Sequence, residues 1–306
     1  MAGTSVPRVV VVTRQTEYRA LIARQGTRGQ AEFFLEGRAQ SIAPLDEGDR
    51  MFDAALATVL GAIPTDWRRA RVDRSDLDRF LFEPDDIVVA LGQDGLVANA
   101  AKYLSGQPVI GCNPDPRRYE GVLVRHAPHE ARGLIGRVAH AGTGRSADAL
   151  DVQERVMVEA VLDDGQRLLA LNEIFVGHQS HQSARYTIEA AGASERQSSS
   201  GIVVTTGTGA TGWGRSISLE RRSAVAMPAP EEPALAFFVR EAWPSVTSGA
   251  TLTEGRLDAG TPLGVTSEMN AGGVVFGDGI EADRLDFAFG RRVSVGVANQ
   301  RLRLVL

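Results

Sequence analysis

Short apolar runs and stretches of helical periodicity alternate over the first ~120 residues. Arg8–Thr13, Ile87–Leu91 and Pro108–Cys112 have the length and the apolar content of buried strands. Asp46–Gly61 repeats its apolar positions with the period of a helix, and Val97–Leu104 is also expected to be helical. Strands that feed helices at this spacing predict βαβ units around a parallel sheet.

The pattern changes near Gly121. From Gln153 to Thr206 the chain consists of short β runs separated by polar turns, which favours an antiparallel β domain. Gly192–Gly201 is polar and serine-rich and is expected to be a loop between hairpin strands. The sequence therefore predicts an α/β N-terminal domain with a parallel sheet, residues 1–122, and a C-terminal antiparallel β-rich domain, residues 123–306.

Composition narrows the function classes. The 306 residues carry 33 basic and 38 acidic side chains, a net charge of −5, which disfavours a general nucleic-acid binder. Lys102 is the only lysine, which excludes a mechanism that needs a second lysine, and no G-K-S/T P-loop is present. Cys112 is the only cysteine, which excludes a disulfide framework and a multi-cysteine metal site. The early apolar run Val9–Val12 is too short for a signal or membrane segment. A cytoplasmic protein without nucleic-acid or membrane partners is expected.

Gly92-Gln93-Asp94-Gly95 lies between a predicted strand and a predicted helix. Glycines let the backbone approach a phosphate, and a helix start supplies oriented N–H groups. A carboxylate is unfavourable for anion binding alone, so Asp94 suggests a proton acceptor for a hydroxyl nucleophile or a contact to magnesium. The alternative is an N-cap aspartate in a tight turn.

The segment Thr205–Trp213 forms a second glycine-rich turn. Gly207–Gly212 spells G-x-G-x-x-G, but it follows antiparallel-looking strands, which argues against a dinucleotide-binding βαβ unit. Several threonine hydroxyls beside flexible backbone, and the flat face of Trp213, could instead contact a nucleotide. The alternative is a polar turn with a buried tryptophan.

Two further acidic segments are candidates. Asn172-Glu173 interrupts the apolar stretch Leu168–Val176, where polar residues are costly unless they are paired. Asp278-Gly279 directly follows the strand-like run Val274–Phe276. Each of these segments alone is typical of a turn or of an internal hydrogen-bonded pair.

Other polar residues give weaker indications. His178-x-x-His181 and His126-x-x-His129 have no cysteine nearby, so no metal site is predicted from them. Arg14, Arg117 and Arg118 could assist with phosphates, although surface charge is the simpler interpretation for each of them.

Taken together and in this order, the four segments resemble the NAD kinase family, within the diacylglycerol-kinase-like superfamily, as a divergent member. That family carries G-G-D-G after a strand, then N-E, then a T-P-T-G-S-T-A-Y type segment and a late D-G. The corresponding segments here are Gly92-Gln93-Asp94-Gly95, Asn172-Glu173, Thr206-Gly207-Thr208-Gly209-Ala210-Thr211-Gly212-Trp213 and Asp278-Gly279. The strand and asparagine that follow the first motif also have a counterpart, which ends at Asn113.

The resemblance implies a two-domain fold with its site between the domains and ATP-dependent phosphorylation of the adenosine-ribose 2′-hydroxyl of NAD, with Mg²⁺ accompanying ATP. It makes Asp94 the catalytic acid–base residue and Gly92, Gln93 and Gly95 the phosphate loop. It further implies a homo-oligomer, a dimer or tetramer. The residues expected at the nucleotide or substrate are Asn113, Asn172, Glu173, Thr206, Thr208, Thr211, Trp213, Ser216 and Asp278.

Several departures from the family pattern keep other functions open. Gln93 replaces a glycine and Leu96 a threonine, while Ser200 stands where an aspartate is usual, at a position associated with the nicotinamide end. A kinase of the same fold could therefore act on another hydroxylated acceptor, such as a sugar, nucleoside or lipid. A non-catalytic nucleotide-binding module is the third possibility, against which the intact Asp94 argues. The sequence does not distinguish ATP from polyphosphate as donor, or NAD from NADH as acceptor.

Overall fold

The computed structural model describes residues 6–141 and 150–306. The chain folds into two compact units. Unit 1 comprises Met1–Gln153 with Arg303–Leu306, and unit 2 comprises Glu154–Leu302. The sequence predicts the domain boundary near residue 122. The helix α5 (Ala131–Ala141) lies beyond that point, and its buried residues belong to the core of unit 1.

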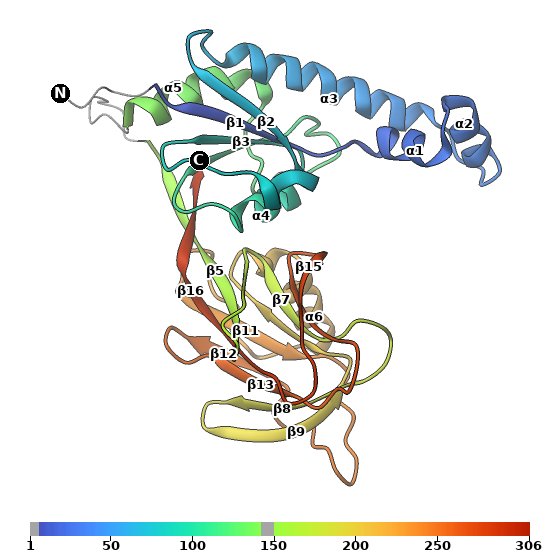
Figure 1. The fold of residues 1–306 in the computed structure, drawn as a ribbon, viewed down its shortest axis with the longest axis vertical. Helices are drawn as coiled ribbons and strands as arrows, with labels where there is room; N and C mark the ends of the chain where they lie inside the picture. The colour runs from blue at the N-terminus through green and yellow to red at the C-terminus, as the bar shows by residue number, and fades with distance from the viewer. Residues whose placement is uncertain (1–5, 142–149) are drawn as a thin grey trace. The chain divides into compact units, whose positions relative to one another are not determined.

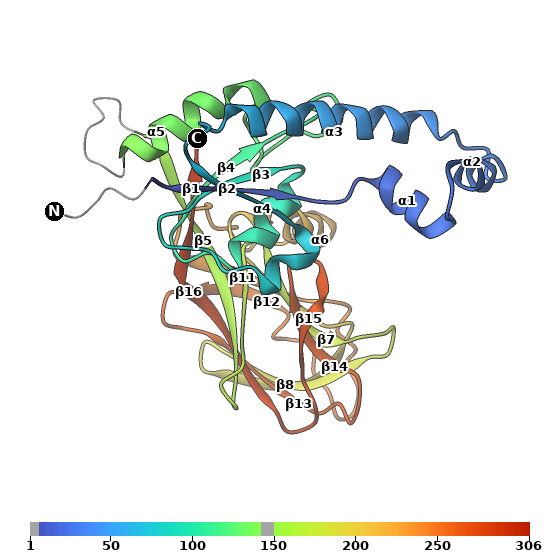
Figure 2. The ribbon, with the colours of Figure 1, turned by 45° about the horizontal axis from the view of Figure 1, so that its top comes forward.

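Unit 1 is an α/β unit built on parallel strands, in the order β2-β1-β3-β4. The last residues of β16 continue this sheet, because Arg303 and Leu304 pair in parallel with β4. The helices α3 and α5 lie on one face of these strands and α4 lies on the other (Figures 1 and 2). The elements of this unit are β1 (Arg8–Thr13), α1 (Glu17–Gln25), α2 (Arg28–Glu36), α3 (Ala43–Ala62), β2 (Arg68–Asp73), β3 (Ile87–Leu91), α4 (Asp94–Ala101), β4 (Pro108–Cys112) and α5 (Ala131–Ala141).

Burial explains why the strands of unit 1 read as continuous apolar runs. Both faces of this sheet are covered by helices, so every residue of β3 and all but the first of β1 and β4 are buried. On the face of α3 and α5, the periodic side chains of these helices pack on inward residues of β1 and β3, for example Leu56 and Ile135 against Val89. The parallel sheet expected from the sequence is thereby confirmed.

Unit 2 is a β-sandwich with one helix outside it. One sheet has the antiparallel order β16-β13-β8-β9, and β5 pairs with β16 and β6. The other sheet has six antiparallel strands in the order β12-β11-β10-β7-β14-β15. The elements are β5 (Val152–Leu162), β6 (Arg167–Ala170), β7 (Glu173–His178), β8 (Ala184–Ala190), β9 (Ala193–Ser199), β10 (Ile202–Thr205), α6 (Trp213–Arg221), β11 (Ala234–Val239), β12 (Glu254–Asp258), β13 (Leu263–Ser267), β14 (Gly273–Gly277), β15 (Ile280–Asp286) and β16 (Arg292–Val305).

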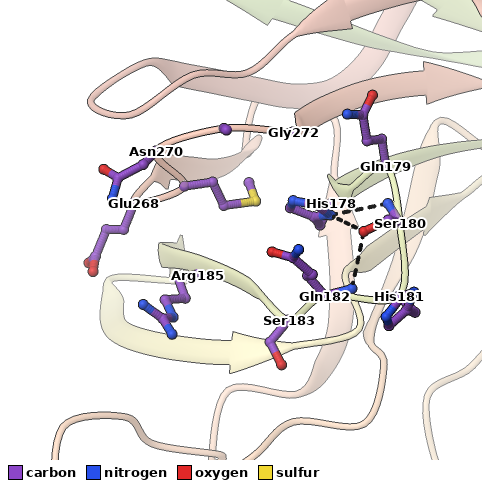
Figure 3. A pocket seen from close by; sticks show the side chains of 12 residues that line it. His178, Gln179, Ser180, His181, Gln182, Ser183, Arg185, Glu268, Asn270 and Gly272 are labelled. Carbon is purple, nitrogen blue, oxygen red and sulfur yellow. Dashed lines mark hydrogen bonds between the residues drawn. The ribbon is translucent and has the colours of Figure 1, made fainter.

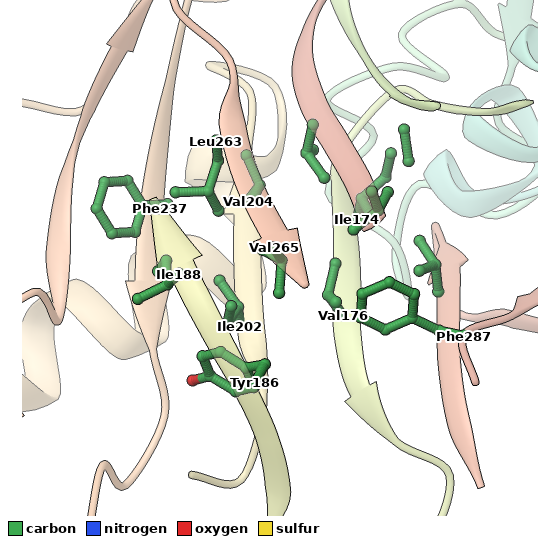
Figure 4. Packing of buried hydrophobic residues seen from close by; sticks show 14 of the residues in the cluster. Ile174, Val176, Tyr186, Ile188, Ile202, Val204, Phe237, Leu263, Val265 and Phe287 are labelled. Atoms are coloured by element: carbon green, nitrogen blue, oxygen red, sulfur yellow. The ribbon is translucent and has the colours of Figure 1, made fainter. Parts of the chain in front are cut away.

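Alternating side chains build the core between the two sheets of unit 2. Tyr186 and Val265 come from one sheet and meet Val176, Ile202 and Val204 from the other (Figure 4). The opposite face of the six-stranded sheet forms a second cluster, which α6 covers through Ile217 and Trp213. Alternation along each strand therefore divides the apolar residues between two cores, as expected for a sheet covered on both faces.

Two expectations about elements need correction. Gly192–Gly201 is not a loop, because Ala193–Ser199 forms the edge strand β9, paired along its whole length with β8. Its inward side chains are polar, but Gln197 and Ser199 are buried and hydrogen-bond to the Tyr186 hydroxyl, so a serine-rich strand is stable here. The helix expected over Val97–Leu104 begins three residues earlier, at Asp94. Its first residues are polar or glycine, so the apolar periodicity does not reveal where the helix starts.

Candidate functional site

The first glycine-rich turn connects β3 to α4 in unit 1. The Gly92 amide closes the turn by donating to the Cys112 carbonyl over 3.0 Å. Gln93 is the N-cap residue of α4, so the first amides of the helix face the carboxyl end of the parallel strands without partners inside the helix. The three residues Gly92, Gln93 and Gly95 line a cavity of about 200 Å³ in this unit.

Asp94 is the first residue of α4, and its carboxylate holds a separate loop. Oδ1 accepts the amides of Leu123 and Val124 over 2.7 and 3.0 Å, and Oδ2 accepts the Val122 amide over 3.0 Å. A carboxylate has about four lone-pair positions, two on each oxygen. One position on Oδ2 therefore remains for a further donor such as a substrate hydroxyl.

Asn113 is buried and shapes the loop that follows β4. Its Oδ1 accepts the Asp115 amide and its Nδ2 donates to the Tyr119 carbonyl, both over 3.0 Å. Gly121 lies close to this amide group and has a φ of +72°, a conformation that favours glycine. The side chain of Asn113 is thus committed to the protein itself in this structure.

Asp278 brings two distant motifs together in unit 2. Its carboxylate accepts the amides of Leu171 and Asn172 over 2.8 and 2.7 Å, across more than a hundred residues of sequence. Its own amide donates to the Glu173 carbonyl over 3.1 Å, and its φ is +54°. The late D-G motif and the N-E motif therefore form one hydrogen-bonded unit.

The Glu173 carboxyl is the strongly perturbed group of this cluster. Burial raises the pKa of Glu173 to about 7, and the nearby negative charge of Asp278 acts in the same direction. Glu173 can therefore exchange a proton near neutral pH. A group of this kind suits either hydrogen-bond donation to a ligand or acceptance of a ligand hydroxyl.

Thr206 connects the threonine-rich turn to the same backbone. Its hydroxyl donates to the Leu171 carbonyl over 2.6 Å and accepts the amides of Thr208 and Gly209 over 3.1 and 3.2 Å. Its own amide donates to the Asn172 carbonyl over 2.9 Å. The structure thus brings three of the four sequence motifs, separated along the chain, into one network within unit 2.

The remaining hydroxyl residues of this turn divide into a buried and an exposed set. Thr208 is buried, and its Oγ1 lies 3.4 Å from a guanidinium nitrogen of Arg155. Thr211 is exposed, although its hydroxyl donates to the Thr208 carbonyl over 2.9 Å. Ser216 is exposed on the first turns of α6. Thr211 and Ser216 are therefore the hydroxyl residues of this group that a ligand can reach directly.

Trp213 begins α6 and lies over an aromatic cluster. Its ring stacks on Phe175 with centroids 6.0 Å apart at 16°, and the Arg240 guanidinium lies 5.4 Å from its centroid. Together with Phe276 and Arg284 these side chains line a second cavity of about 200 Å³. The flat ring of a ligand could enter a cavity of this size and aromatic lining. The geometry therefore agrees with the expectation that the face of Trp213 is available to a ligand.

The loop between β7 and β8 carries the histidine pair noted in the sequence. His178 and His181 line a wide cavity of about 760 Å³, and the His178 Nδ1 accepts the Ser180 amide over 3.1 Å (Figure 3). Within residues 6–141 and 150–306 no group of three or more metal-binding side chains comes together. This cavity is separate from the network around Asp278 in its lining residues.

Sequence reasoning missed Arg155, a guanidinium only 2% exposed beside the second turn. A charged residue at an otherwise apolar position of β5 is the signal that could have found it, because buried charges require partners. Phe175 and Arg240 were missed as well, since each lies within an apolar or turn segment without a motif of its own. Their role emerges only from the packing around Trp213.

Comparison with solved structures identifies the fold as that of the NAD kinases. A yeast NADH kinase solved with NADH superimposes with a TM-score of 0.60 at 13% identity, covering 99% of this chain and 84% of that one. An NAD kinase from Archaeoglobus fulgidus solved with ATP superimposes with a TM-score of 0.59 at 16% identity, covering 98% of this chain and 93% of that one. The predicted fold class is confirmed.

Curated relatives point to the same family. The chain is 29% identical to NAD kinase 2, mitochondrial, of Rattus norvegicus over 267 residues, which cover 73% of this chain and 63% of that protein. The human protein of the same name is 28% identical and is covered to 60%, and the Xenopus tropicalis protein is 26% identical and is covered to 64%. The chain thus spans less than two thirds of these relatives. No protein-family model matches it. The predicted resemblance to the NAD kinase family, as a divergent relative, is confirmed.

One expectation is overturned by these relatives. A cytoplasmic location was expected, but all three curated relatives carry a mitochondrial name. Composition and the lack of a long early apolar run do not distinguish a cytoplasmic from a mitochondrial location, because mitochondrial transit segments are amphipathic and arginine-rich and not continuously apolar. Among the described residues, no helix has the length and apolar character needed to cross a membrane.

Proposed function

We propose that the chain is an ATP-dependent kinase that phosphorylates the adenosine-ribose 2′-hydroxyl of NAD to give NADP. The observation that carries the proposal is the network in unit 2. Asp278, Asn172 and Thr206 belong to three motifs that were matched by their residues and their order in the sequence, and in the structure these residues hydrogen-bond to one another. Independent surface turns would have no reason to converge in this way.

Unit 1 supplies the groups for phosphoryl transfer in this proposal. The Gly92–Gly95 turn offers backbone amides to phosphate oxygens, and Asp94 accepts the proton of the attacking hydroxyl through the remaining lone-pair position on Oδ2. The donor is used as its magnesium complex, since Mg²⁺ neutralises phosphate charge in this chemistry. The protein itself contributes positioning and hydrogen bonds.

Unit 2 supplies the groups for the acceptor. We assign Asn172 and Glu173 to the adenosine ribose, with Thr211 and Ser216 as the exposed hydroxyls beside it and Trp213 as the stacking surface. The hydroxyls of Thr206 and Thr208, and the carboxylate of Asp278, act by holding the turn, because each is already hydrogen-bonded within the protein. Asn113 has the same supporting role in unit 1.

The assembly and the domain division are part of the proposal. We assign a dimer or tetramer of identical chains on the resemblance to the family, and we take the α/β and β-rich units, which divide at Gln153 and not near residue 122, as the two functional domains. Light scattering on the purified chain measures its mass directly, and a monomer at working concentration would contradict the oligomer.

A second acceptor class is favoured by two observations. Ser200 is exposed where the family has an acidic residue, and Gln93 adds an amide to the phosphate loop. Incubation with Mg-ATP and a panel of NAD, NADH, nucleosides, sugars and diacylglycerol tests both candidates, with NADP measured by an NADP-specific dehydrogenase and ADP measured separately. NADP formation supports the first function, whereas ADP release only with another acceptor supports the second. Nucleotide binding without turnover on any acceptor would contradict both.

A further inference from the structure

The wide cavity of unit 2 lies between two loops of the β-sandwich (Figure 3). One loop, residues 179–183, joins β7 to β8, and the other, residues 268–272, joins β13 to β14. β7 and β14 belong to the six-stranded sheet, whereas β8 and β13 belong to the other sheet, so each loop passes from one sheet to the other. The cavity of about 760 Å³ has a volume typical of sites for small molecules.

Backbone hydrogen bonds fix the walls of this cavity. The Gln179 amide donates to the Gly272 carbonyl over 2.8 Å. The Glu268 amide donates to the Arg185 carbonyl, also over 2.8 Å. Between these two anchor points of the second loop, Met269 is buried in the core of the sandwich. The fold itself therefore orders the cavity, which lowers the entropy that a ligand would lose the protein on binding.

His178 presents an oriented N–H group at the cavity. The Ser180 amide donates to its Nδ1 over 3.1 Å, and because an amide nitrogen can only donate, the proton of the neutral imidazole is on Nε2. The ring packs against Gly272, where an added Cβ would clash with the imidazole and where the φ of +72° also favours glycine. No described residue accepts a hydrogen bond from Nε2, so this donor is available to a ligand.

The charges around the cavity favour an anion. Arg185 is exposed near the start of β8, and none of the acidic residues that the structure describes forms an ion pair with its side chain. Glu268 is the acidic residue of the lining, but its Oε2 accepts the Arg196 Nε over 2.6 Å and its Oε1 accepts the Thr187 hydroxyl over 3.2 Å. The cavity thus keeps an uncompensated guanidinium, a group whose planar fork matches phosphate oxygens.

The neutral polar side chains of the lining suit hydroxyl groups. Gln179, Gln182 and Asn270 each carry both a donor and an acceptor, as a sugar hydroxyl does. Apart from the two histidines, no aromatic side chain from the described part of the chain lines this cavity. A stacking surface for a nucleobase is therefore missing, and the lining favours a polyol over a nucleotide.

We propose that this cavity is a second ligand site, which binds a sugar phosphate or a similar phosphate ester of a polyol. The Arg185 guanidinium and the Nε2–H of His178 bind the phosphate group. The amide side chains of Gln182 and Asn270 bind the hydroxyl groups.

The proposed site goes beyond the kinase function and does not depend on it. β7 begins at Glu173 and ends at His178, so the N-E motif and the cavity lie roughly 17 Å apart at the rise of an extended strand. The smaller cavity at Trp213 also has His178 and Gln179 in its lining. Binding must therefore be measured while the kinase substrates are present.

Calorimetry with glucose 6-phosphate and glycerol 3-phosphate tests the site, on protein saturated with NAD and Mg-ADP. At least one of the two probes should bind saturably, with one molecule per chain. Glucose and inorganic phosphate alone should bind at least about 10-fold more weakly than the better probe, because each lacks one of the two groups that the cavity recognises. No binding of either probe, binding that disappears when NAD and Mg-ADP are added, or equal binding of inorganic phosphate would overturn the proposal.

Variants then place the probe in the cavity. Arg185→Gln is expected to weaken binding about 10- to 100-fold, the loss typical of one charge-assisted contact. His178→Phe keeps a flat ring against Gly272 but has no N–H group, and it should weaken binding about 3- to 10-fold. Arg167→Gln is the matched control, because it removes an arginine that pairs with Glu159 elsewhere in unit 2, and it should change binding less than about twofold. Thermal melting verifies that each variant is folded, and equal effects of Arg185→Gln and Arg167→Gln would overturn the proposal.

Discussion

The two units of this chain hold their functional turns by the same device and differ in what surrounds it. Asp94 in unit 1 and Asp278 in unit 2 each accept backbone amides from a segment far along the chain. In unit 2 the carboxylate also lies beside the half-buried Glu173, whose pKa is raised to about 7. Unit 2 therefore places a carboxyl group that titrates near neutral pH beside this hydrogen-bonding device.

The glycines of the two turns also differ in the space around them. A Cβ added at Gly95 would meet no described atom within 4 Å, whereas one added at Gly209 would clash with the Asn172 carbonyl and the Thr205 hydroxyl. The turn of unit 1 is open toward its cavity, while the turn of unit 2 packs on its own backbone. Glycine thus serves access in one unit and close packing in the other.

The largest effect is expected from Asp94→Asn. NADP formation should fall about 10²- to 10⁴-fold, because the general base is lost. The side-chain NH₂ group that this substitution introduces would also face backbone amides that the carboxylate accepted. Coupled-enzyme rates measure this loss, and Asp85→Asn, an exposed neighbour in sequence, is the control expected to keep full activity. Turnover near the wild-type level in Asp94→Asn would remove the catalytic role from this residue.

The pH dependence of stability tests the second unit. Glu173 keeps its proton in the folded state up to a pH of about 7, while in the unfolded chain it loses it near 4.5, so stability falls as the pH rises through this window. The loss from this group is about 3 kcal/mol. Glu173→Gln should lack it.

Chemical denaturation of wild type and Glu173→Gln between about pH 5 and pH 8 measures this difference. The exposed Glu231→Gln serves as the control and should follow the wild-type curve. If the wild type and Glu173→Gln change in parallel across this range, the carboxyl titrates at its ordinary value and the contrast between the units disappears.

The smallest effects concern the two glycines. Gly209→Ala should destabilise the chain by about 1–3 kcal/mol, the usual cost of overpacking, because the added methyl group meets the Asn172 carbonyl. Gly95→Ala, in the first turn of α4, should leave stability within about 1 kcal/mol of wild type or raise it. Thermal melting of the two variants side by side decides the comparison, and equal destabilisation would show that both turns are packed alike.

Much of the fold could be predicted from the local pattern of apolar and polar residues. The apolar runs at β1, β3 and β4 predicted buried parallel strands, because a sheet covered on both faces leaves no polar side. The polar strand β9 was missed, since its inward Gln197 and Ser199 are stabilised by the Tyr186 hydroxyl and not by apolar contact. Periodicity reports burial of apolar side chains and is silent about buried polar ones.

The candidate site could be predicted from the sequence only in part. Motif order indicated Asp94, Glu173, Thr206 and Asp278, but their partners could not be read from the sequence. Asp278 reaches Leu171 and Asn172 across 107 and 106 residues, and Arg155 reaches Thr208 across 53. Such pairings follow from strand order and register, which local sequence does not encode.

The sequence by itself determined the alternation of elements, the order of the four motifs and the resemblance to the NAD kinases, because each of these is a property of neighbouring residues. Only the tertiary structure decided which backbone amides each acidic residue holds, which arginine lines a cavity, and which glycines have no room for a side chain. The physical reason is that hydrogen bonds and steric limits depend on atoms brought together by folding, whereas hydrophobic periodicity is set within each segment.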